Sequence, residues 1–391
     1  MPELPAAEWT RREGLARLVA ALGADHVRYV GGAVRDTLLG LEAKDIDCAT
    51  THRPDAVIAL CREAGIRTVP TGIEHGTVTA VLPDGPVEVT TLRRDVATDG
   101  RRATVAFASK WRDDAARRDF TINALYAHAQ TLEIGDYFGG LDDLAARRVR
   151  FIGDPEQRIA EDHLRILRFF RFQARFGDAP DPDALAACSA LANTLKGLSR
   201  ERVAAELLAL LALPDPSPTV GLMHETGVLA VILPEATRTQ RDALAQLVTV
   251  ERQSGIAPDP IRRLAALIPS LAPTAEALAA RLRLSKQQRG RLICAAERVP
   301  QDAADPRALA YEHGLACAQD RLLLAGASVA ALTGWTVPRF PLTGRVVIER
   351  GVSAGPDVAR LLRAAETRWI AAGFPDEAAA LRLLDEVMAN A

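Results

Sequence analysis

The sequence has 391 residues, and at roughly 150 residues per domain this length predicts two or three domains. Hydrophobic residues make up 48% of the chain and charged residues 25%, as in ordinary globular proteins, and no apolar run approaches the ~18 residues that a membrane span needs. The net charge of −2 does not indicate a nucleic-acid binder, so an argument for RNA must rest on the positions of particular arginines.

The cysteines and the start of the chain bear on the cellular compartment. Five cysteines are scattered without C-x-x-C spacing, which predicts neither a disulfide framework nor a zinc cluster. The opening residues, MPELPAAEWTRREG, lack the basic and apolar regions of a secretory leader. We therefore expect a reducing cytoplasmic environment.

The first ~140 residues have the sequence pattern of a mixed α/β domain. Short β-branched segments bounded by turn residues predict strands, and the segments between them have helical spacing. Strands are expected at 26–30, 45–51, 77–82 and 87–92, and helices at 15–22, 33–40 and 54–65.

After about residue 154 the strand signals nearly vanish. Apolar residues at helical spacing predict one helix over 154–177 and a second over 199–216, for which Ser199 is a suitable N-cap. More helical segments follow, separated by Pro and Gly. The predicted fold class is α+β, with a small N-terminal mixed sheet followed by an all-α remainder.

Two glycines stand between the first predicted strand and the next helix. Gly31 and Gly32 would let the backbone approach a ligand closely, and the helix behind them would offer unpaired N–H groups to a phosphate. Arg35, in the first helical turn, could add a fork of charged donors. The alternative is a plain turn, since neither a P-loop nor a G-x-G-x-x-G motif is present here.

Two aspartates follow at 45 and 47. Side chains at i and i+2 of a strand point to the same face, so Asp45 and Asp47 would lie side by side while Ile46 enters the core. Their repulsion would be relieved by a divalent cation, and Mg²⁺ prefers carboxylates plus substrate phosphates. Glu88, in another predicted strand, could be a third acidic residue of this site. The alternative is a solvated strand end.

The order G-G-x-V-R-D followed by D-x-D resembles the signature of the nucleotidyltransferase superfamily. More narrowly, it is similar to the class II tRNA nucleotidyltransferase and bacterial poly(A) polymerase family. The resemblance implies a metal-dependent nucleotidyl transfer. Asp45 and Asp47 would be catalytic metal ligands, with Glu88 as a further catalytic carboxylate.

Residues 116–126, ARRDFTINALY, are similar to the second motif of that family. In the family this segment contacts the sugar and triphosphate of the incoming nucleotide. Arg118 would then serve the phosphates, while Asp119 and Asn123 would bind the ribose or hold the local network. Asp119 could also act as a helix N-cap.

Residues 158–172, RIAEDHLRILRFFRF, resemble the segment with which the family selects C and A without a nucleic-acid template. On one helix, Asp162 and Arg165 are i and i+3 and would share a face, so that they could bind the Watson–Crick edges of both bases. Arg168 could still reach the nucleotide, and Arg171 only through its length or a bent helix. The alternative is a surface ion pair.

Two further stretches extend the resemblance. Residues 198–207 are similar to a family motif that braces the selecting helix, and we assign structural roles to Glu201, Arg202 and Glu206. The C-terminal segment from about residue 341 also resembles the family, although Arg345 stands where an acid is usual.

The family contains both CCA-adding and poly(A)-adding enzymes. The segment TGIEHGTVTAVL, 71–82, is closer to CCA-adding relatives, and the long basic tail of many poly(A) polymerases is missing. Enzymes that add only CC or only A share these motifs. No His-Asp dipeptide occurs, so we expect no HD-type phosphohydrolase activity. From other classes, a catalytically silent RNA-binding protein or a nucleotidyltransferase for small molecules or proteins remains an alternative.

The resemblance implies three parts: a catalytic head at 1–145, a neck with the nucleotide-selecting helix at 146–210, and an all-α body and tail at 211–391 that bind the tRNA acceptor arm. The expected function is template-independent addition of C, C and A to the 3′ end of tRNA from CTP and ATP, with release of pyrophosphate. Mg²⁺ is the expected cofactor. We expect a cytoplasmic protein without a membrane or an obligatory protein partner.

Overall fold

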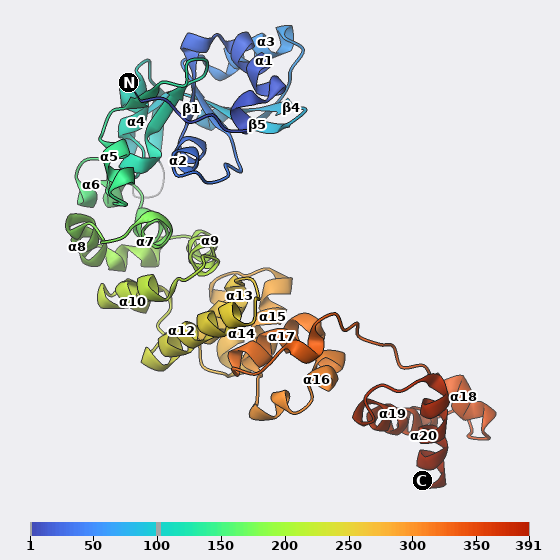
Figure 1. Ribbon diagram of the computed structural model, residues 1–391. Coiled ribbons are helices and arrows are strands. Elements are labelled where there is room, and N and C mark those ends of the chain that lie inside the picture. Colours follow the sequence, from blue (N-terminus) through green and yellow to red (C-terminus); the bar gives the residue numbers. More distant parts are fainter. Residues whose placement is uncertain (1, 99–102, 391) are drawn as a thin grey trace. The chain divides into compact units, whose positions relative to one another are not determined.

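The computed structural model describes residues 2–98 and 103–390 of the chain (Figure 1). The chain divides into two compact units, Met1–Pro234 and Glu235–Ala391. The first unit contains the strands, and the described elements of the second unit are all helical. The finer division at 145 and 210 remains a prediction.

A seven-stranded mixed sheet forms the core of the first unit, in the order β3-β4-β5-β2-β1-β8-β9. Neighbouring strands are antiparallel except β2 and β5, which are parallel. A separate two-stranded ribbon is formed by β6 (Arg93–Thr98) and β7 (Ala103–Phe107). The strands of the main sheet are β1 (Val27–Val30), β2 (Asp47–Thr50), β3 (Arg67–Gly72), β4 (Thr77–Leu82), β5 (Gly85–Thr91), β8 (Leu125–His128) and β9 (Ile134–Asp136).

The predicted fold class is confirmed, and so are the strands expected at 26–30, 77–82 and 87–92. The strand expected at 45–51 begins two residues later, at Asp47. Strands β3, β6, β7, β8 and β9 were not predicted from the sequence.

Five α-helices belong to the same region as the sheet. Helices α1 and α3 pack against each other and against β4, whereas α2 packs against β1 and β8. Helix α1 has its buried residues Leu15, Leu18 and Leu22 at helical spacing, which gives it one apolar face. The helices are α1 (Glu13–Leu22), α2 (Gly32–Leu38), α3 (Pro54–Glu63), α4 (Trp111–Ala116) and α5 (Gly140–Ala145).

Six helices complete the first unit. The prediction of one helix over 154–177 is wrong: α6 ends at Glu161, the chain turns, and α7 begins at Arg165. Helix α7 packs against α9, and its Phe169 ring lies against Phe120 and Phe151. The helices are α6 (Pro155–Glu161), α7 (Arg165–Phe176), α8 (Pro182–Ala190), α9 (Arg200–Leu211), α10 (Ser217–Glu225) and α11 (Val228–Ile232).

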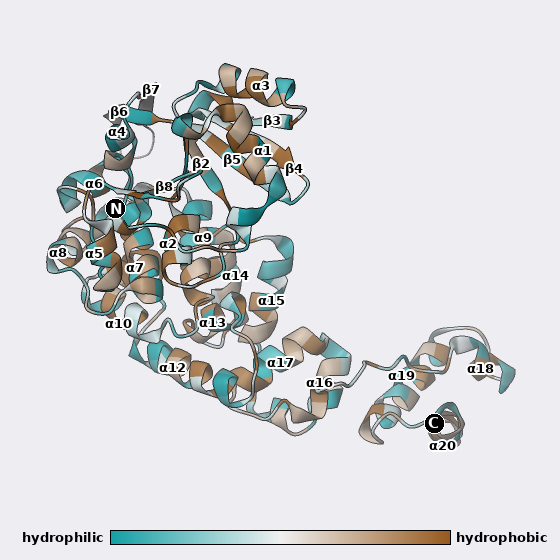
Figure 2. Cartoon of the chain, turned by 45° about the horizontal axis from the view of Figure 1, so that its top comes forward, coloured by the Kyte–Doolittle hydropathy of each residue, from teal (hydrophilic) through white to brown (hydrophobic). Residues whose placement is uncertain are grey.

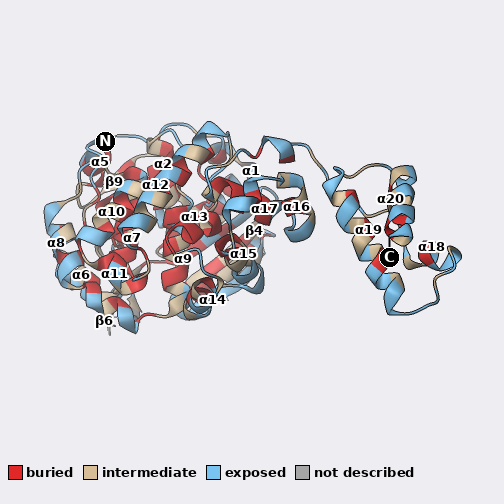
Figure 3. Ribbon diagram, turned by 90° about the horizontal axis from the view of Figure 1, so that it is seen from below, coloured by how far each residue is buried: buried red, intermediate tan, exposed pale blue. Residues whose placement is uncertain are grey.

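Helix α13 lies in the interior of the second unit, packs against α12, α15 and α17, and has all residues from Ile261 to Ala266 buried (Figure 3). Helix α12 is amphipathic, and brown and teal residues alternate along it in Figure 2. The helices up to the C-terminal group are α12 (Arg238–Gln253), α13 (Pro260–Ala266), α14 (Ala272–Arg281), α15 (Lys286–Ala296), α16 (Pro306–His313) and α17 (Leu315–Leu324).

Charges are buried inside this helical unit. Arg263 donates to Glu251 at 2.8 Å, and Arg262 lies 3.1 Å from both Glu251 and Asp320. These side chains are at most 4% exposed. Removing one partner would leave an uncompensated buried charge, so we regard the network as a structural element that joins α12, α13 and α17.

The cysteine spacing predicted no disulfide framework, yet one pair of cysteines is bonded. Cys294 on α15 and Cys317 on α17 form a disulfide, with Cα atoms 6.0 Å apart. Cys48, Cys61 and Cys188 are free and buried. The two cysteines are 23 residues apart in the sequence, and the packing of α15 against α17 brings them together. Their spacing alone therefore did not predict the pairing.

The three last helices share a small core. Leu361, Trp369 and Leu384 are buried in it, and Trp369 donates to the carbonyl of Pro375 at 2.7 Å. The helices are α18 (Gly344–Glu349), α19 (Pro356–Ala371) and α20 (Glu377–Ala389). Within the described ranges, we find no helix with the length and apolar character that crossing a bilayer requires.

Candidate active site

A polar pocket of about 450 Å³ opens in the first unit. Strands, the ends of helices and the connections between them supply its wall. The lining residues are Val30, Asp47, Cys48, Thr77, Glu88, Thr90, Arg93, Arg117, Arg118, Asp119, Asp162, Leu164, Arg165, Arg168 and Arg202. Six arginines and four acids among them make this a site for a ligand with both anionic and hydrogen-bonding groups.

Two carboxylates meet across the parallel strands. Asp47 on β2 lies directly opposite Glu88 on β5 in the strand register. Burial raises the pKa of Asp47, the negative charges of Glu88 and Asp45 raise it further, and Arg118 lowers it. This accumulation of negative charge is an environment that a bound cation would relieve.

Asp45 does not share a strand with Asp47, so the expected i and i+2 geometry is wrong. Strand β1 ends at Val30, which is the partner of Asp47, and no residue of β1 remains to pair with Asp45. Asp45 lies in an exposed bend, while Ile46 is buried as predicted. The negative charge of Asp45 nevertheless raises the pKa of Asp47, which lines the pocket.

The resemblance to nucleotidyltransferases implies a divalent metal, and the donors here fit one in part. Among the described residues, no three or more His, Cys, Asp or Glu side chains form a ready metal cage. Two carboxylates from adjacent strands are nevertheless the donor set that a hard cation shares with substrate phosphates. Asp47 and Glu88 would hold such a cation, with Asp45 beside them.

The glycine turn lies against an arginine of the pocket. Gly31 has a φ of +71°, which favours glycine, and a Cβ at this position would lie 3.4 Å from Nη1 of Arg118. Gly32 begins α2. Neither glycine is among the residues that line the described part of the pocket.

Arg35 faces away from the pocket, contrary to the expected phosphate contact. Its Nε donates to Asp36 at 2.8 Å, its Nη1 donates to Asn123 at 2.5 Å, and its guanidinium lies 4.2 Å from the centre of the Phe176 ring. Helix α2 is buried around this residue, since all residues from Ala33 to Thr37 are buried, and Arg35 is 6% exposed. Asn123 in turn donates to Asp119 at 2.9 Å. Arg35 and Asn123 therefore support a pocket residue from behind.

Asp119 joins the sheet region to α7. Its Oδ2 accepts a hydrogen bond from Nε of Arg168 at 2.7 Å. Burial raises the pKa of Asp119, but the charge of Arg168 and the Asn123 amide bring it below the usual value. Glu206 on α9 accepts from Arg171 at 2.6 Å and lies 3.7 Å from Arg168. Arg171 is thus engaged behind the pocket and is not among its described lining residues.

Asp162 and Arg165 line the pocket, but not from one helical face. Asp162 has extended backbone angles after α6, and its Oδ1 accepts from the N–H of Leu164 at 3.1 Å. Its Oδ2 accepts from Arg202 at 2.7 Å. Asp side chains favour such turns, which explains why the helix breaks here. Arg165 donates to Glu161 at 2.6 Å, so each of the two residues has a protein partner of its own.

Sequence reasoning missed three arginines of the pocket. Arg117 and Arg202 lie inside the motifs that it singled out, but Arg117 received no role and Arg202 only a structural one. Arg93 begins β6 and had no signal beyond its charge.

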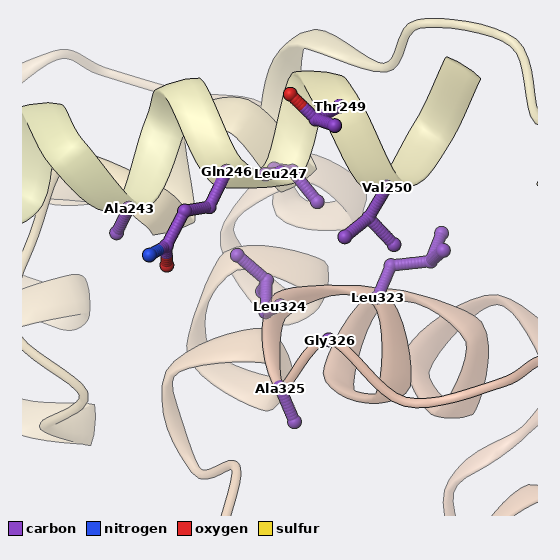
Figure 4. A pocket seen from close by; sticks show the side chains of 9 residues that line it. All are labelled: Ala243, Gln246, Leu247, Thr249, Val250, Leu323, Leu324, Ala325 and Gly326. Carbon is purple, nitrogen blue, oxygen red and sulfur yellow. The ribbon is translucent and has the colours of Figure 1, made fainter. Parts of the chain in front are cut away.

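A second pocket, of about 360 Å³, lies in the second unit between α12 and the end of α17 (Figure 4). Its lining residues are Ala243, Gln246, Leu247, Thr249, Val250, Leu323, Leu324, Ala325 and Gly326. None of these carries a charge, so a triphosphate would find no ionic partner there.

The fold and the polar pocket define a nucleotidyltransferase of the poly(A) polymerase head type. The family model described as "Poly A polymerase head domain" matches residues 27–150, and "Probable RNA and SrmB- binding site of polymerase A" matches residues 179–239. More narrowly, the chain belongs to the class II CCA tRNA nucleotidyltransferase family, as the following relatives show.

CCA tRNA nucleotidyltransferase 1, mitochondrial, from Homo sapiens is 35% identical over 376 residues, covering 90% of this chain and 84% of the relative. The CCA-adding enzyme of Levilactobacillus brevis is 32% identical over 373 residues, covering 90% and 91%. Among solved structures, the CCA-adding enzyme of Bacillus stearothermophilus in complex with CTP is 26% identical, with a TM-score of 0.72 over 98% of this chain and 99% of that one.

Proposed function

We propose that this chain adds C, C and A to the 3′ end of tRNA from CTP and ATP, without a nucleic-acid template. The observation that carries the proposal is one pocket in which Asp47 and Glu88 face a group of arginines, next to Asp162 and Arg165. The first two suit nucleotidyl transfer, and the last two suit the recognition of a base. Family membership supports the same reaction.

The chemistry is an in-line attack of the RNA 3′-OH on the α-phosphorus, with pyrophosphate as the leaving group. Arg118 lines the pocket and holds the triphosphate in line with the attacking hydroxyl. Asp47, Asp45 and Glu88 would hold Mg²⁺, which would neutralise phosphate charge and make the attacking hydroxyl more acidic. Asp119 binds the ribose, steadied by Asn123 and Arg168.

Asp162 and Arg165 select the base. A carboxylate accepts from the amino group that C and A share, while a guanidinium donates to a ring nitrogen or carbonyl. Arg202 holds Asp162, and Glu161 holds Arg165, so that the two selecting groups are oriented before a nucleotide enters. Arg168 lines the pocket beside them. Arg171 lies behind the pocket and pairs with Glu206, which also contacts Arg168.

The acceptor arm of tRNA is the proposed RNA partner, bound mainly through phosphate contacts with arginines of the second unit. We also propose a cytoplasmic location. The Cys294–Cys317 disulfide weakens the cysteine argument for it, and the human and mouse relatives carry "mitochondrial" in their names.

The test uses purified protein, Mg²⁺ and tRNA that ends before its CCA, with CTP and ATP supplied singly and together. Products are resolved at one nucleotide on a gel. Two additions with CTP alone and three with both nucleotides are expected. A long ladder with ATP alone would indicate a poly(A) polymerase, additions confined to CC or to A a partial enzyme, and no extension a silent RNA-binding protein.

A further inference from the structure

A buried carboxylate stands behind the arginines of the pocket. Asp114 lies on α4 with its side chain 2% exposed, and it is not among the lining residues of the described pocket. Its Oδ1 accepts from Nε of Arg117 at 2.8 Å and from the backbone N–H of Arg93 at 3.1 Å, and its Oδ2 lies 3.3 Å from Nη2 of Arg118. One carboxylate therefore contacts three residues that do line the pocket.

The hydroxyl of Tyr126 completes this arrangement. Tyr126 on β8 is fully buried, and its hydroxyl donates to Oδ2 of Asp114 at 2.6 Å. The same hydroxyl accepts from Nε of Arg118 at 3.0 Å. Because a tyrosine has a single hydroxyl proton, its donation to Asp114 leaves the oxygen lone pairs for Arg118. The three side chains form a closed triangle.

The triangle determines which donors of Arg118 are left for a ligand. Nε is taken by Tyr126, one hydrogen of Nη2 by Asp114, and one hydrogen of Nη1 by the carbonyl of Asn123 at 3.5 Å. A guanidinium has five N–H groups, so within residues 2–98 and 103–390 these contacts leave one hydrogen on each terminal nitrogen. Two N–H groups of one guanidinium can bind phosphate oxygens together.

Asp114 is stabilised in its ionised form by its neighbours. Burial raises its pKa, but the positive charges of Arg118 and Arg117 and the hydrogen bond from Tyr126 bring the pKa well below the usual value. The carboxylate thus offsets part of the repulsion between two neighbouring arginines without entering the pocket.

We propose that Asp114, together with Tyr126, is a positioning residue that orients Arg117 and Arg118 toward the triphosphate of the incoming nucleotide. The inference rests on the proposed function, and it adds a residue that contacts neither the nucleotide nor the reacting atoms. It predicts that loss of the triangle weakens triphosphate binding and leaves base selection intact.

The chain offers a matched control in Asp143. This aspartate on α5 is fully buried, accepts from the hydroxyl of Thr121 at 2.6 Å, and pairs with Arg148 and Arg150. Its side-chain partners are of the same kinds as those of Asp114, one hydroxyl and two arginines, but none of these residues is among those lining the described pocket.

The experiment compares Tyr126→Phe, Asp114→Asn and Asp143→Asn in the full chain. Equilibrium dialysis without tRNA measures the affinity for CTP, inorganic triphosphate and cytidine, and steady-state kinetics give KM for CTP and for tRNA. Tyr126→Phe should weaken CTP and inorganic triphosphate binding about 3- to 10-fold, and Asp114→Asn about 10- to 100-fold. Cytidine affinity, KM for tRNA and the preference for C and A should be unchanged.

Asp143→Asn should lower the melting temperature without changing the affinity for CTP. Unchanged CTP affinity in folded Tyr126→Phe and Asp114→Asn would overturn the inference, and so would an equal loss in Asp143→Asn. Because dialysis needs no RNA, a wild-type chain that binds CTP but extends no tRNA would refute the proposed function while leaving the positioning role open to measurement by the same variants.

Discussion

Replacing Asp162 with alanine tests the base-selecting role at little cost to folding. Asp162 and Arg202 are 27% and 35% exposed, and an ion pair so open to water contributes at most about 1 kcal/mol. Loss of the hydrogen bond from the Leu164 N–H adds about 1 kcal/mol. We therefore expect a stability loss of about 1–2 kcal/mol, which a folded domain tolerates.

The effect on selection should be larger. A hydrogen bond between a carboxylate and the amino group of C or A is worth about 1.5–3 kcal/mol, which corresponds to about 10- to 150-fold in the ratio of kcat/KM values. The assay measures single additions to tRNA lacking CCA with each of the four nucleoside triphosphates. The preference for C and A over U and G should fall by that factor, while tRNA binding persists.

Asp178 supplies the control for Asp162. It accepts from Nε of Arg147 at 2.9 Å in a similar pair that is more exposed and lies outside the described pocket lining. Asp178→Ala should leave the preference unchanged. If folded Asp162→Ala keeps the wild-type preference, Asp162 does not select the base.

Three further predictions follow from the carboxylates and the disulfide. Asp47→Ala should reduce addition below detection on a one-nucleotide gel while filter retention of tRNA persists; retained turnover would contradict its role. Asp47→Asn should raise the melting temperature at pH 7. The pKa of Asp47 is near 3.8 in the unfolded chain and higher in the folded protein, so ionisation of Asp47 lowers the stability of the folded protein as the pH rises through these two values. A melting temperature below that of the wild type would count against the buried charge. Cys294→Ser should destabilise the second unit by about 3 kcal/mol in chemical denaturation under oxidising conditions, with no difference from wild type in reductant, since the disulfide closes a separation of 23 residues.

Much of the sheet could be predicted because its central strands alternate clearly. Strand β4, Thr77–Leu82, buries every second residue and was predicted at its true bounds. Strand β3 contains Pro70, lies at the sheet edge and is mostly exposed, so it lacks that alternation. Strands β8 and β9 have only four and three residues, too few for a period to emerge.

The break between α6 and α7 shows a limit of periodicity. Ile159, Leu164 and Ile166 are all buried although the chain turns between them. Apolar spacing reports burial, and two short helices on one core give the same pattern as a single long helix.

In the candidate active site, too, local sequence patterns did not reveal the contacts that arise from tertiary packing. The motifs singled out Asp47, Arg118 and Asp162 because each stands in a recognisable local pattern. Asp114 lies outside these motifs and Tyr126 ends one of them, but neither received a role, because their contact depends on the packing of α4 against β8. Arg35 was misplaced for the same reason: its sequence position gives its helix but not its burial.

The polar pocket is lined by residues between positions 30 and 202, all of which precede the boundary at Pro234. The part of the sequence that would select a base thus ends before the helical second unit begins. Substitutions, insertions or exchange of the second segment can accumulate during evolution without altering one side chain of the pocket. We therefore expect exchange of the second segment to change which RNA is bound before it changes which nucleotide is added.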